Sequence, residues 1–137
     1  MSAAPTLAHS LAHSLARSTA AVGLAGASAL HVRWTKQTID GTLPDDFAEV
    51  WIGDGARVPP AWMTAGVAGV LAAMTGSVAA NHRSARLVGG ILAARAAGGF
   101  VASGLSSSDG PFRARDLALY SPFCATLATL IWLGSRR

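Results

Sequence analysis

The sequence predicts an all-α integral membrane protein, a bundle of four transmembrane helices within a single domain, residues 1–137. Hydrophobic residues make up 51% of the chain and charged residues only 13%, where soluble domains carry about a quarter. Its apolar stretches are each roughly 20 residues long, which at about 1.5 Å per residue matches a bilayer core of about 30 Å. Spans are expected at residues 15–34, 61–80, 87–105 and 117–133.

Composition also excludes several classes of protein. The formal net charge is +4, but the basic residues stand singly or in pairs between apolar blocks and form no basic face, so nucleic acid is not an expected partner. The single cysteine, Cys124, allows no intramolecular disulfide and no cysteine-based metal cluster. The lipid bilayer is the expected partner, and the sequence indicates neither a metal site nor a particular cofactor.

The first span, residues 15–34, follows a repeated Leu-Ala-His-Ser motif in residues 7–14. We expect that repeat to form an amphipathic lead-in at the membrane surface. Arg17 extends from one end of the span, and Trp34 lies at the other interface. A second interpretation stays open, because a basic residue, a short apolar run and Ala-Ser-Ala at 27–29 also resemble a signal peptide with its cleavage site.

A polar loop, residues 35–59, contains five of the seven acidic residues of the chain. Pro44 opens a turn in this loop, and Asp45 and Asp46 follow it. Gly53 is typical of the residue after a helix end, so a short interfacial helix is predicted between the turn and Gly53. It would lie on the membrane surface or cover the bundle, because its apolar residues share one side. These apolar residues are Phe47, Val50 and Trp51.

Spans two and three are rich in small residues at a spacing of four, which permits close helix approach. The third span contains one charge, Arg95, near its middle. A guanidinium there costs at least about 2.5 kcal/mol and therefore needs a partner. We expect span three to be central and packed on more than one side. The strips that predict this contact are Gly69 and Ala73 in span two, and Gly90, Ala94, Gly98 and Ala102 in span three.

The fourth span is expected to begin at residue 117 with Asp116 as its N-cap. Arg95 would then lie deeper in the membrane than Asp116. Side chains lean toward the N-terminus of their own helix, so these two residues would lean in opposite directions. No span contains an acid. The predicted partner of Arg95 is consequently a backbone carbonyl, water at the cytoplasmic side, or a group outside the chain, such as the anionic or carbonyl group of a ligand.

The orientation of the protein in the membrane is predicted from the number of spans and from the distribution of charged residues between the loops. An even number of spans puts both termini on one side of the cell membrane. Five basic loop or terminal residues fall on each side, but every acid falls on the side opposite the termini. Both termini are therefore expected to be cytoplasmic.

Three segments carry a family resemblance: residues 30–34 (LHVRW), 95–100 (RAAGGF) and 112–124, which ends in YSPFC. In this order they resemble a bacterial four-helix integral membrane family, catalogued as domain-of-unknown-function family 3995. The resemblance implies a four-helix membrane fold and no particular activity. Relatives often carry an acid where Gly99 stands and an aromatic residue where Arg33 stands, which implies that Arg95 lacks such an acid here.

We predict a non-enzymatic bundle that binds a lipid or small amphipathic ligand, or an accessory subunit of another membrane protein. No residue is assigned a catalytic role. The alternative is a membrane-embedded enzyme that acts on a lipid-soluble substrate through His31, Tyr120 and Arg95, and a transporter is disfavoured because no span contains a carboxylate. The candidate ligand-binding residues are His31, Trp34, Arg95, Asp116, Tyr120 and Cys124.

Overall fold

The computed structural model describes residues 4–53, 55–105 and 109–135, and all regular structure in these ranges is helical. Three stretches are long and apolar enough to cross a membrane: Ala61–Ala79, Ala85–Leu105 and Pro111–Gly134. The elements, in chain order, are α1 (Ala4–Asp40), α2 (Phe47–Trp51), α3 (Ala61–Ala79), α4 (Ala85–Leu105), α5 (Pro111–Arg115), the π-helical turn η1 (Asp116–Tyr120) and α6 (Ser121–Gly134).

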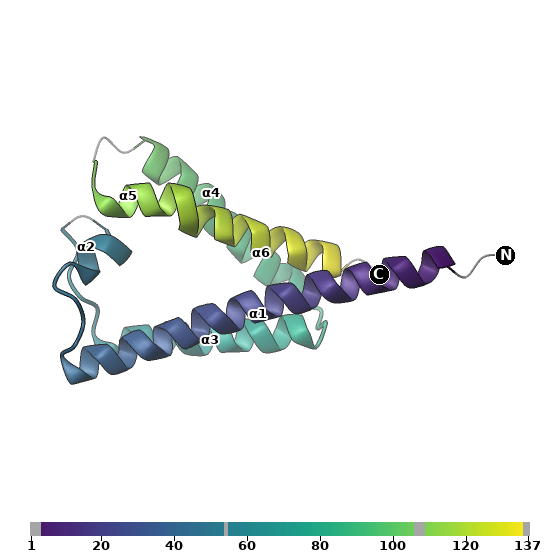
Figure 1. The fold of residues 1–137 in the computed structure, drawn as a ribbon, viewed down its shortest axis with the longest axis horizontal. Helices are drawn as coiled ribbons and strands as arrows, with labels where there is room; N and C mark the ends of the chain where they lie inside the picture. Colours follow the sequence, from purple (N-terminus) through teal and green to yellow (C-terminus); the bar gives the residue numbers. More distant parts are fainter. Residues whose placement is uncertain (1–3, 54, 106–108, 136–137) are drawn as a thin grey trace.

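The helices form two pairs that make a V (Figure 1). One pair is α1 with α3, and the other is α4 with the continuous helix α5–η1–α6. The pairs meet at the end where α6 finishes, which we call the narrow end. They diverge toward the opposite, wide end, where α2 lies between them (Figure 1).

The hydrophobic core lies where the two pairs meet. Leu24 from α1 and Ile131 from α6 are 1% and 0% exposed, and they share a buried cluster with residues of α3 and α4. Glycine allows close approach here, since a Cβ built at Gly89 would fall 2.7 Å from Nε1 of Trp132. In lipid the hydrophobic effect does not drive helices together, so close van der Waals packing of this kind is what stabilises their association.

Helix α1 is longer than the predicted first span. It continues without a break from Ala4 to Asp40, six residues beyond Trp34, where the span was predicted to end. The helix ends in a Schellman motif at Gly41, whose φ of +66° suits glycine. In that motif the amide of Thr42 donates to the carbonyl of Gln37 at 2.9 Å. At about 1.5 Å per residue, 37 residues extend roughly 55 Å, well beyond a bilayer core of about 30 Å.

The last helix starts earlier than predicted. Gly110 is the N-cap residue and Pro111 occupies the first turn, where its missing N–H costs nothing. The prediction that Asp116 caps this helix is therefore wrong, because Asp116 lies more than a turn inside it. The widened turn η1 precedes Pro122, and the amide of Ser121 donates to the carbonyl of Asp116, five residues back. A proline ring that clashes with the preceding turn is a common cause of such a bulge.

The other predicted helices are confirmed. The short helix in the first loop is α2, and it buries Phe47 and Val50. The helices α3 and α4 match the second and third predicted spans within two residues at each end.

The expected role of the small-residue strips is not confirmed. Nothing lies within 4 Å of a Cβ built at Gly69, Gly90 or Gly98, so these strips face outward rather than toward another helix of the chain. The helix α4 packs mainly against α6 on one side instead of lying at the centre. Its buried residues are Ala85, Val88, Gly89, Leu92, Ala96, Gly99 and Ser103.

Candidate functional site

A buried carboxylate, that of Asp116, joins α4 to the last helix. Arg95 Nη2 donates to its Oδ1 at 2.8 Å, and Ser103 Oγ donates to its Oδ2 at 2.6 Å. Ser121 Oγ also donates to Oδ1, at 3.2 Å. We call Arg95, Ser103, Asp116 and Ser121 the polar cluster. Three donors from two helices thus bond to one carboxylate. A carboxylate that is buried away from water stays ionised only when such donors compensate its charge.

Two features of local structure bring the polar cluster together. On α4, Arg95, Gly99 and Ser103 are four residues apart and therefore share a face. On the last helix, Asp116 and Ser121 are five apart, a spacing that an α-helix would turn to different faces. The π-helical turn η1 aligns them, because its hydrogen bonds run between residues five apart.

Side chains of the polar cluster pack directly against the backbone of Gly99. A Cβ built there would fall 2.8 Å from Oδ2 of Asp116, and closer still to Oγ of Ser121 and Nη1 of Arg95. Any side chain at this position would therefore displace the ion pair. The absent side chain of Gly99 is what admits the carboxylate of Asp116.

The predicted partner of Arg95 is thus corrected. The guanidinium binds the carboxylate of Asp116, not a backbone carbonyl or cytoplasmic-side water. Asp116 was expected at the outer end of the last span because that span was predicted to begin at residue 117, whereas the helix begins at Pro111. Asp116 therefore lies about 7 Å inside the helix. Its carboxylate is beside Gly99 and bonds both to Ser103, one turn nearer the end of α4, and to the long side chain of Arg95, one turn deeper.

Burial of the ion pair is uneven. The side chain of Asp116 is 2% exposed, whereas that of Arg95 is 43% exposed. One edge of the guanidinium holds the carboxylate, and the remaining surface is open to whatever surrounds the helices. Cys124 is half-buried one turn beyond Tyr120, within electrostatic range of both members of the pair.

A second cluster, of aromatic side chains, bridges the two helix pairs at the wide end. The ring of Trp34, from α1, lies 4.7 Å from that of Trp51, on α2. Trp51 stacks on Tyr120 of η1 with ring centroids 5.6 Å apart and an interplanar angle of 27°. The aromatic cluster consists of His31, Trp34, Phe47, Trp51, Phe112 and Tyr120.

The polar atoms of the aromatic cluster bond mainly to the backbone. His31 Nδ1 lies 2.8 Å from the carbonyl of Ala27, an arrangement in which Nδ1 carries the proton and donates it. The Tyr120 hydroxyl donates to the carbonyl of Val50 over 3.5 Å, a long hydrogen bond that ties η1 to α2. The Arg115 guanidinium lies 5.7 Å from the Trp51 ring, within cation–π range.

The six residues named from the sequence therefore fall in two neighbouring groups. His31, Trp34 and Tyr120 meet in the aromatic cluster, and Arg95 and Asp116 meet in the polar cluster, with Cys124 close to the latter. Sequence reasoning missed Ser103, although its spacing of eight from Arg95 was a usable signal. It also missed Ser121, for which no sequence signal existed because only a π turn brings it beside Asp116.

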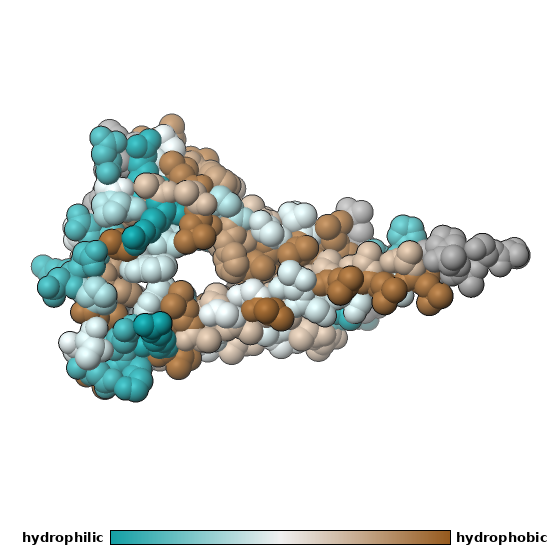
Figure 2. Space-filling model, viewed as in Figure 1, coloured by the Kyte–Doolittle hydropathy of each residue, from teal (hydrophilic) through white to brown (hydrophobic). Residues whose placement is uncertain are grey.

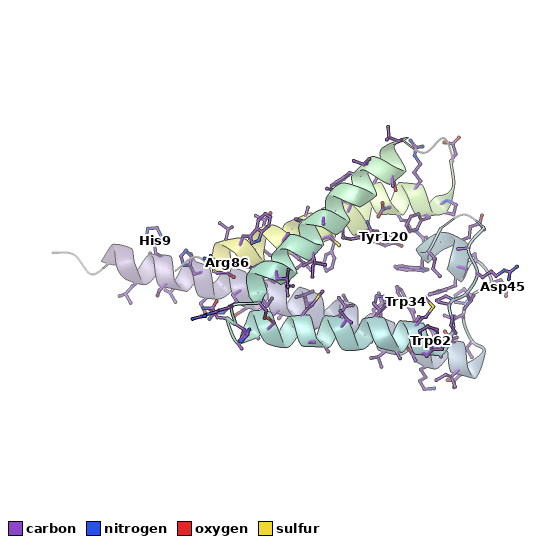
Figure 3. The ribbon with its side chains drawn as sticks, turned by 180° about the vertical axis from the view of Figure 1, so that it is seen from behind. His9, Trp34, Asp45, Trp62, Arg86 and Tyr120 are labelled. Atoms are coloured by element: carbon purple, nitrogen blue, oxygen red, sulfur yellow. The ribbon has the colours of Figure 1, made fainter. Side chains whose placement is uncertain are left out.

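An opening passes between the two helix pairs (Figure 2). Hydrophilic residues gather at the wide end, and hydrophobic residues dominate the arms of the V beyond the opening (Figure 2). Trp34 and Tyr120 belong to opposite pairs and lie on either side of the gap near α2 (Figure 3). The aromatic cluster is therefore the link between the pairs at the wide side of the opening.

Within residues 4–53, 55–105 and 109–135, no three histidine, cysteine or acidic side chains gather closely enough to hold a metal ion. No protein-family model, no curated protein and no solved structure matches this chain.

Proposed function

We propose that the protein is a four-helix integral membrane protein of the cell membrane that binds an amphipathic molecule in the opening between its two helix pairs. The observation that carries the proposal is the opening between the two helix pairs (Figure 2). The aromatic cluster bounds it at the wide side, with Trp34 and Tyr120 on either side of the gap (Figure 3). An apolar cavity with a few convergent polar groups is the usual form of a small-molecule site.

Membrane insertion is supported by the apolar surface of the helices. Large apolar side chains point outward, including those of Trp62, Leu87 and Leu105, which are 74%, 65% and 83% exposed. A soluble protein rarely carries so much contiguous apolar surface. We propose α1 as the fourth membrane crossing, because it packs along α3 over much of its length.

Charge supports a cytoplasmic narrow end. The narrow end carries Arg17, Arg83 and Arg86. Every acidic residue that the structure describes lies within residues 40–49 or 109–116, in the segments that reach the wide end. Basic residues close to the ends of membrane helices favour the cytoplasmic side. Both termini are therefore proposed to be cytoplasmic.

The proposed ligand has an apolar body and a flat or polar head. Aromatic rings of Trp34, Trp51 and Tyr120 supply flat surfaces at the wide side of the opening. The half-exposed guanidinium of Arg95 supplies a positive charge in the polar cluster, whose residue Ser121 directly follows Tyr120. Aromatic residues with one apolar and one polar edge are favoured at the membrane interface. A lipid or another membrane-soluble amphiphile meets these requirements.

Binding is a better proposal than catalysis. An enzyme acting through His31, Tyr120 and Arg95 would need at least two of these groups to converge on one reacting atom. His31 and Tyr120 instead bond to separate backbone carbonyls, and Arg95 bonds to Asp116. None of these three contacts joins one of the groups to another.

Native mass spectrometry of the full-length protein, purified from its membrane in mild detergent, tests the proposal. We expect a bound small molecule on most copies, released at high collision energy. The variant Trp51→Ala removes the ring that links the two pairs and should lose this molecule. Its matched control is Trp62→Ala, which removes an exposed tryptophan at the start of α3 and should retain it.

Protein that carries no small molecule in several detergents would contradict the ligand-binding function. A second protein bound in stoichiometric amount, with no small molecule, would indicate an accessory subunit instead. Equal loss of the molecule from both tryptophan variants would place its binding on the general lipid surface.

Membership of domain-of-unknown-function family 3995 stays a prediction. Its support is the order of the three segments, two of which, residues 95–100 and 112–124, contribute Arg95, Asp116 and Ser121 to the polar cluster.

A further inference from the structure

A cavity of about 350 Å³ opens at the narrow end, far from the aromatic cluster, beside the turn that joins α3 to α4. The residues that line it are Asn81, His82, Arg83, Arg86 and Ser135. Two arginines and a histidine thus line one cavity, and none of the acidic side chains that the structure describes lines it. We call it the basic cavity.

The α3–α4 turn fixes the shape of this cavity through a Schellman motif. The amide of His82 donates to the carbonyl of Ser77 at 3.0 Å, and that of Asn81 donates to Val78 at 3.1 Å. Asn81 has a φ of 50°, in the left-handed region that asparagine tolerates. These hydrogen bonds fix the backbone conformation of the turn, and its polar side chains therefore line the cavity.

His82 presents a donor to the cavity. Its Nδ1 accepts the amide hydrogen of Ser84 at 3.3 Å and lies 2.8 Å from the Ser84 hydroxyl. With Nδ1 acting as acceptor, the ring proton of the neutral imidazole belongs to Nε2. Nε2–H is then free to donate to a bound group.

The two arginines are held differently. Arg86 Nη2 donates to the carbonyl of Ser135, just past the end of α6, at 3.1 Å, which anchors the guanidinium across the cavity. Its other N–H groups remain as donors. Arg83 makes no hydrogen bond or ion pair with any residue in the part of the chain that the structure describes, so its guanidinium can turn toward a ligand.

We propose that the basic cavity binds a phosphate group. Arginine pairs with phosphate oxygens through two parallel N–H bonds, and a basic pocket between membrane helices at the cytoplasmic side is suited to an anionic phospholipid headgroup. Leu87 directly follows Arg86 and is 65% exposed, and Trp132, against Gly89, is 45% exposed. These apolar side chains offer a surface for acyl chains below the headgroup.

Calorimetric titration of the full-length protein in a neutral detergent tests this proposal with three probes. Dihexanoyl phosphatidylglycerol carries the phosphate on a short lipid, dihexanoylglycerol lacks the phosphate, and inorganic phosphate lacks the lipid. We expect the phospholipid to bind and the glyceride not to bind. Binding of inorganic phosphate with equal affinity would make a soluble phosphate the natural ligand.

Charge removal from the cavity is the second part of the test. The double variant Arg83→Gln/Arg86→Gln should weaken phospholipid binding at least tenfold, and Arg83→Gln alone, which keeps the bond from Arg86 to Ser135, about fivefold. The control Arg33→Gln/Arg57→Gln removes two exposed charges near the wide end and should bind like the unmodified protein. Unchanged affinity in Arg83→Gln, or equal binding of the glyceride, would overturn the proposal.

Discussion

At the scale of single residues, Gly99 decides how the two membrane helices meet. Its missing side chain leaves the space in which Arg95 Nη1, Ser121 Oγ and Asp116 Oδ2 converge. The neighbouring glycine, Gly98, points into open space, where nothing lies within 4 Å of a built Cβ. Two adjacent glycines on α4 therefore have different physical roles.

The two adjacent glycines, Gly98 and Gly99, allow a matched test of this packing. Gly99→Ala should lower the free energy of unfolding by about 2 kcal/mol, because the new methyl group displaces the ion pair. Gly98→Ala should leave it unchanged or raise it by up to about 1 kcal/mol through helix propensity. Unfolding of both variants in detergent by sodium dodecyl sulfate titration, followed by circular dichroism, measures the difference. Equal effects would contradict the packing described for Gly99.

The ion pair itself is open to a double-mutant cycle. Asp116→Ala leaves the Arg95 charge without its carboxylate, and Arg95→Leu leaves a buried carboxylate with only two serine donors. Each change should cost about 2 kcal/mol of stability, less than a fully buried pair because Arg95 is 43% exposed. The double variant should lose at least about 1 kcal/mol less than the sum. Strictly additive losses would show that the pair contributes nothing.

At the scale of elements, helix ends and interruptions set the architecture. Glycine and asparagine in left-handed conformations end α1 and α3, and the π turn before Pro122 rotates Asp116 toward α4. The same stretch without η1 would direct Asp116 away from Ser121. The widened turn therefore connects a local irregularity of one helix to the contact between two.

Asn81 tests the importance of a helix end. Its φ of 50° costs an ordinary L-residue about 1 kcal/mol or more, whereas glycine adopts it freely. Asn81→Ala should therefore lower the melting temperature, by an amount corresponding to about 1 kcal/mol, and Asn81→Gly should leave it nearly unchanged. Thermal circular dichroism in detergent compares the two. A larger loss in the glycine variant would mean that the asparagine side chain, not the backbone angle, is what matters.

At the scale of the whole molecule, two helix pairs joined at one end define two ends of different chemistry. The narrow end holds the core and the basic cavity, and the wide end holds α2, the aromatic cluster and a concentration of hydrophilic residues (Figures 1 and 2). We expect this asymmetry to give the molecule one direction of insertion in a bilayer.

Cysteine labelling in intact cells tests that direction. In a Cys124→Ser background, Asp45→Cys places a thiol in the exposed turn before α2, and His82→Cys places one in the exposed α3–α4 turn. A membrane-impermeant maleimide should label position 45 in intact cells, and position 82 only after permeabilisation. The reverse pattern would put the narrow end outside, and labelling of both from outside would contradict four crossings.

Local patterns in the sequence were sufficient for most helices. The positions of α2, α3 and α4 followed from local composition and turn residues alone. The helix α3 is an uncharged apolar run, α4 is an apolar run with one central charge, and α2 lies between Pro44 and Gly53. The candidate residues His31, Trp34, Arg95, Asp116 and Tyr120 were also recognisable, because polar and aromatic side chains stand out in apolar helices.

Contacts between distant residues required the tertiary structure. Arg95 meets Asp116 because a glycine on one helix and a π turn on another combine, and neither feature indicates the other in the sequence. Trp34 meets Tyr120 through Trp51 only because α2 folds back between the diverging pairs. Helix formation depends on short-range hydrogen bonds and hydropathy, whereas helix pairing depends on surface fit between segments that no short pattern describes.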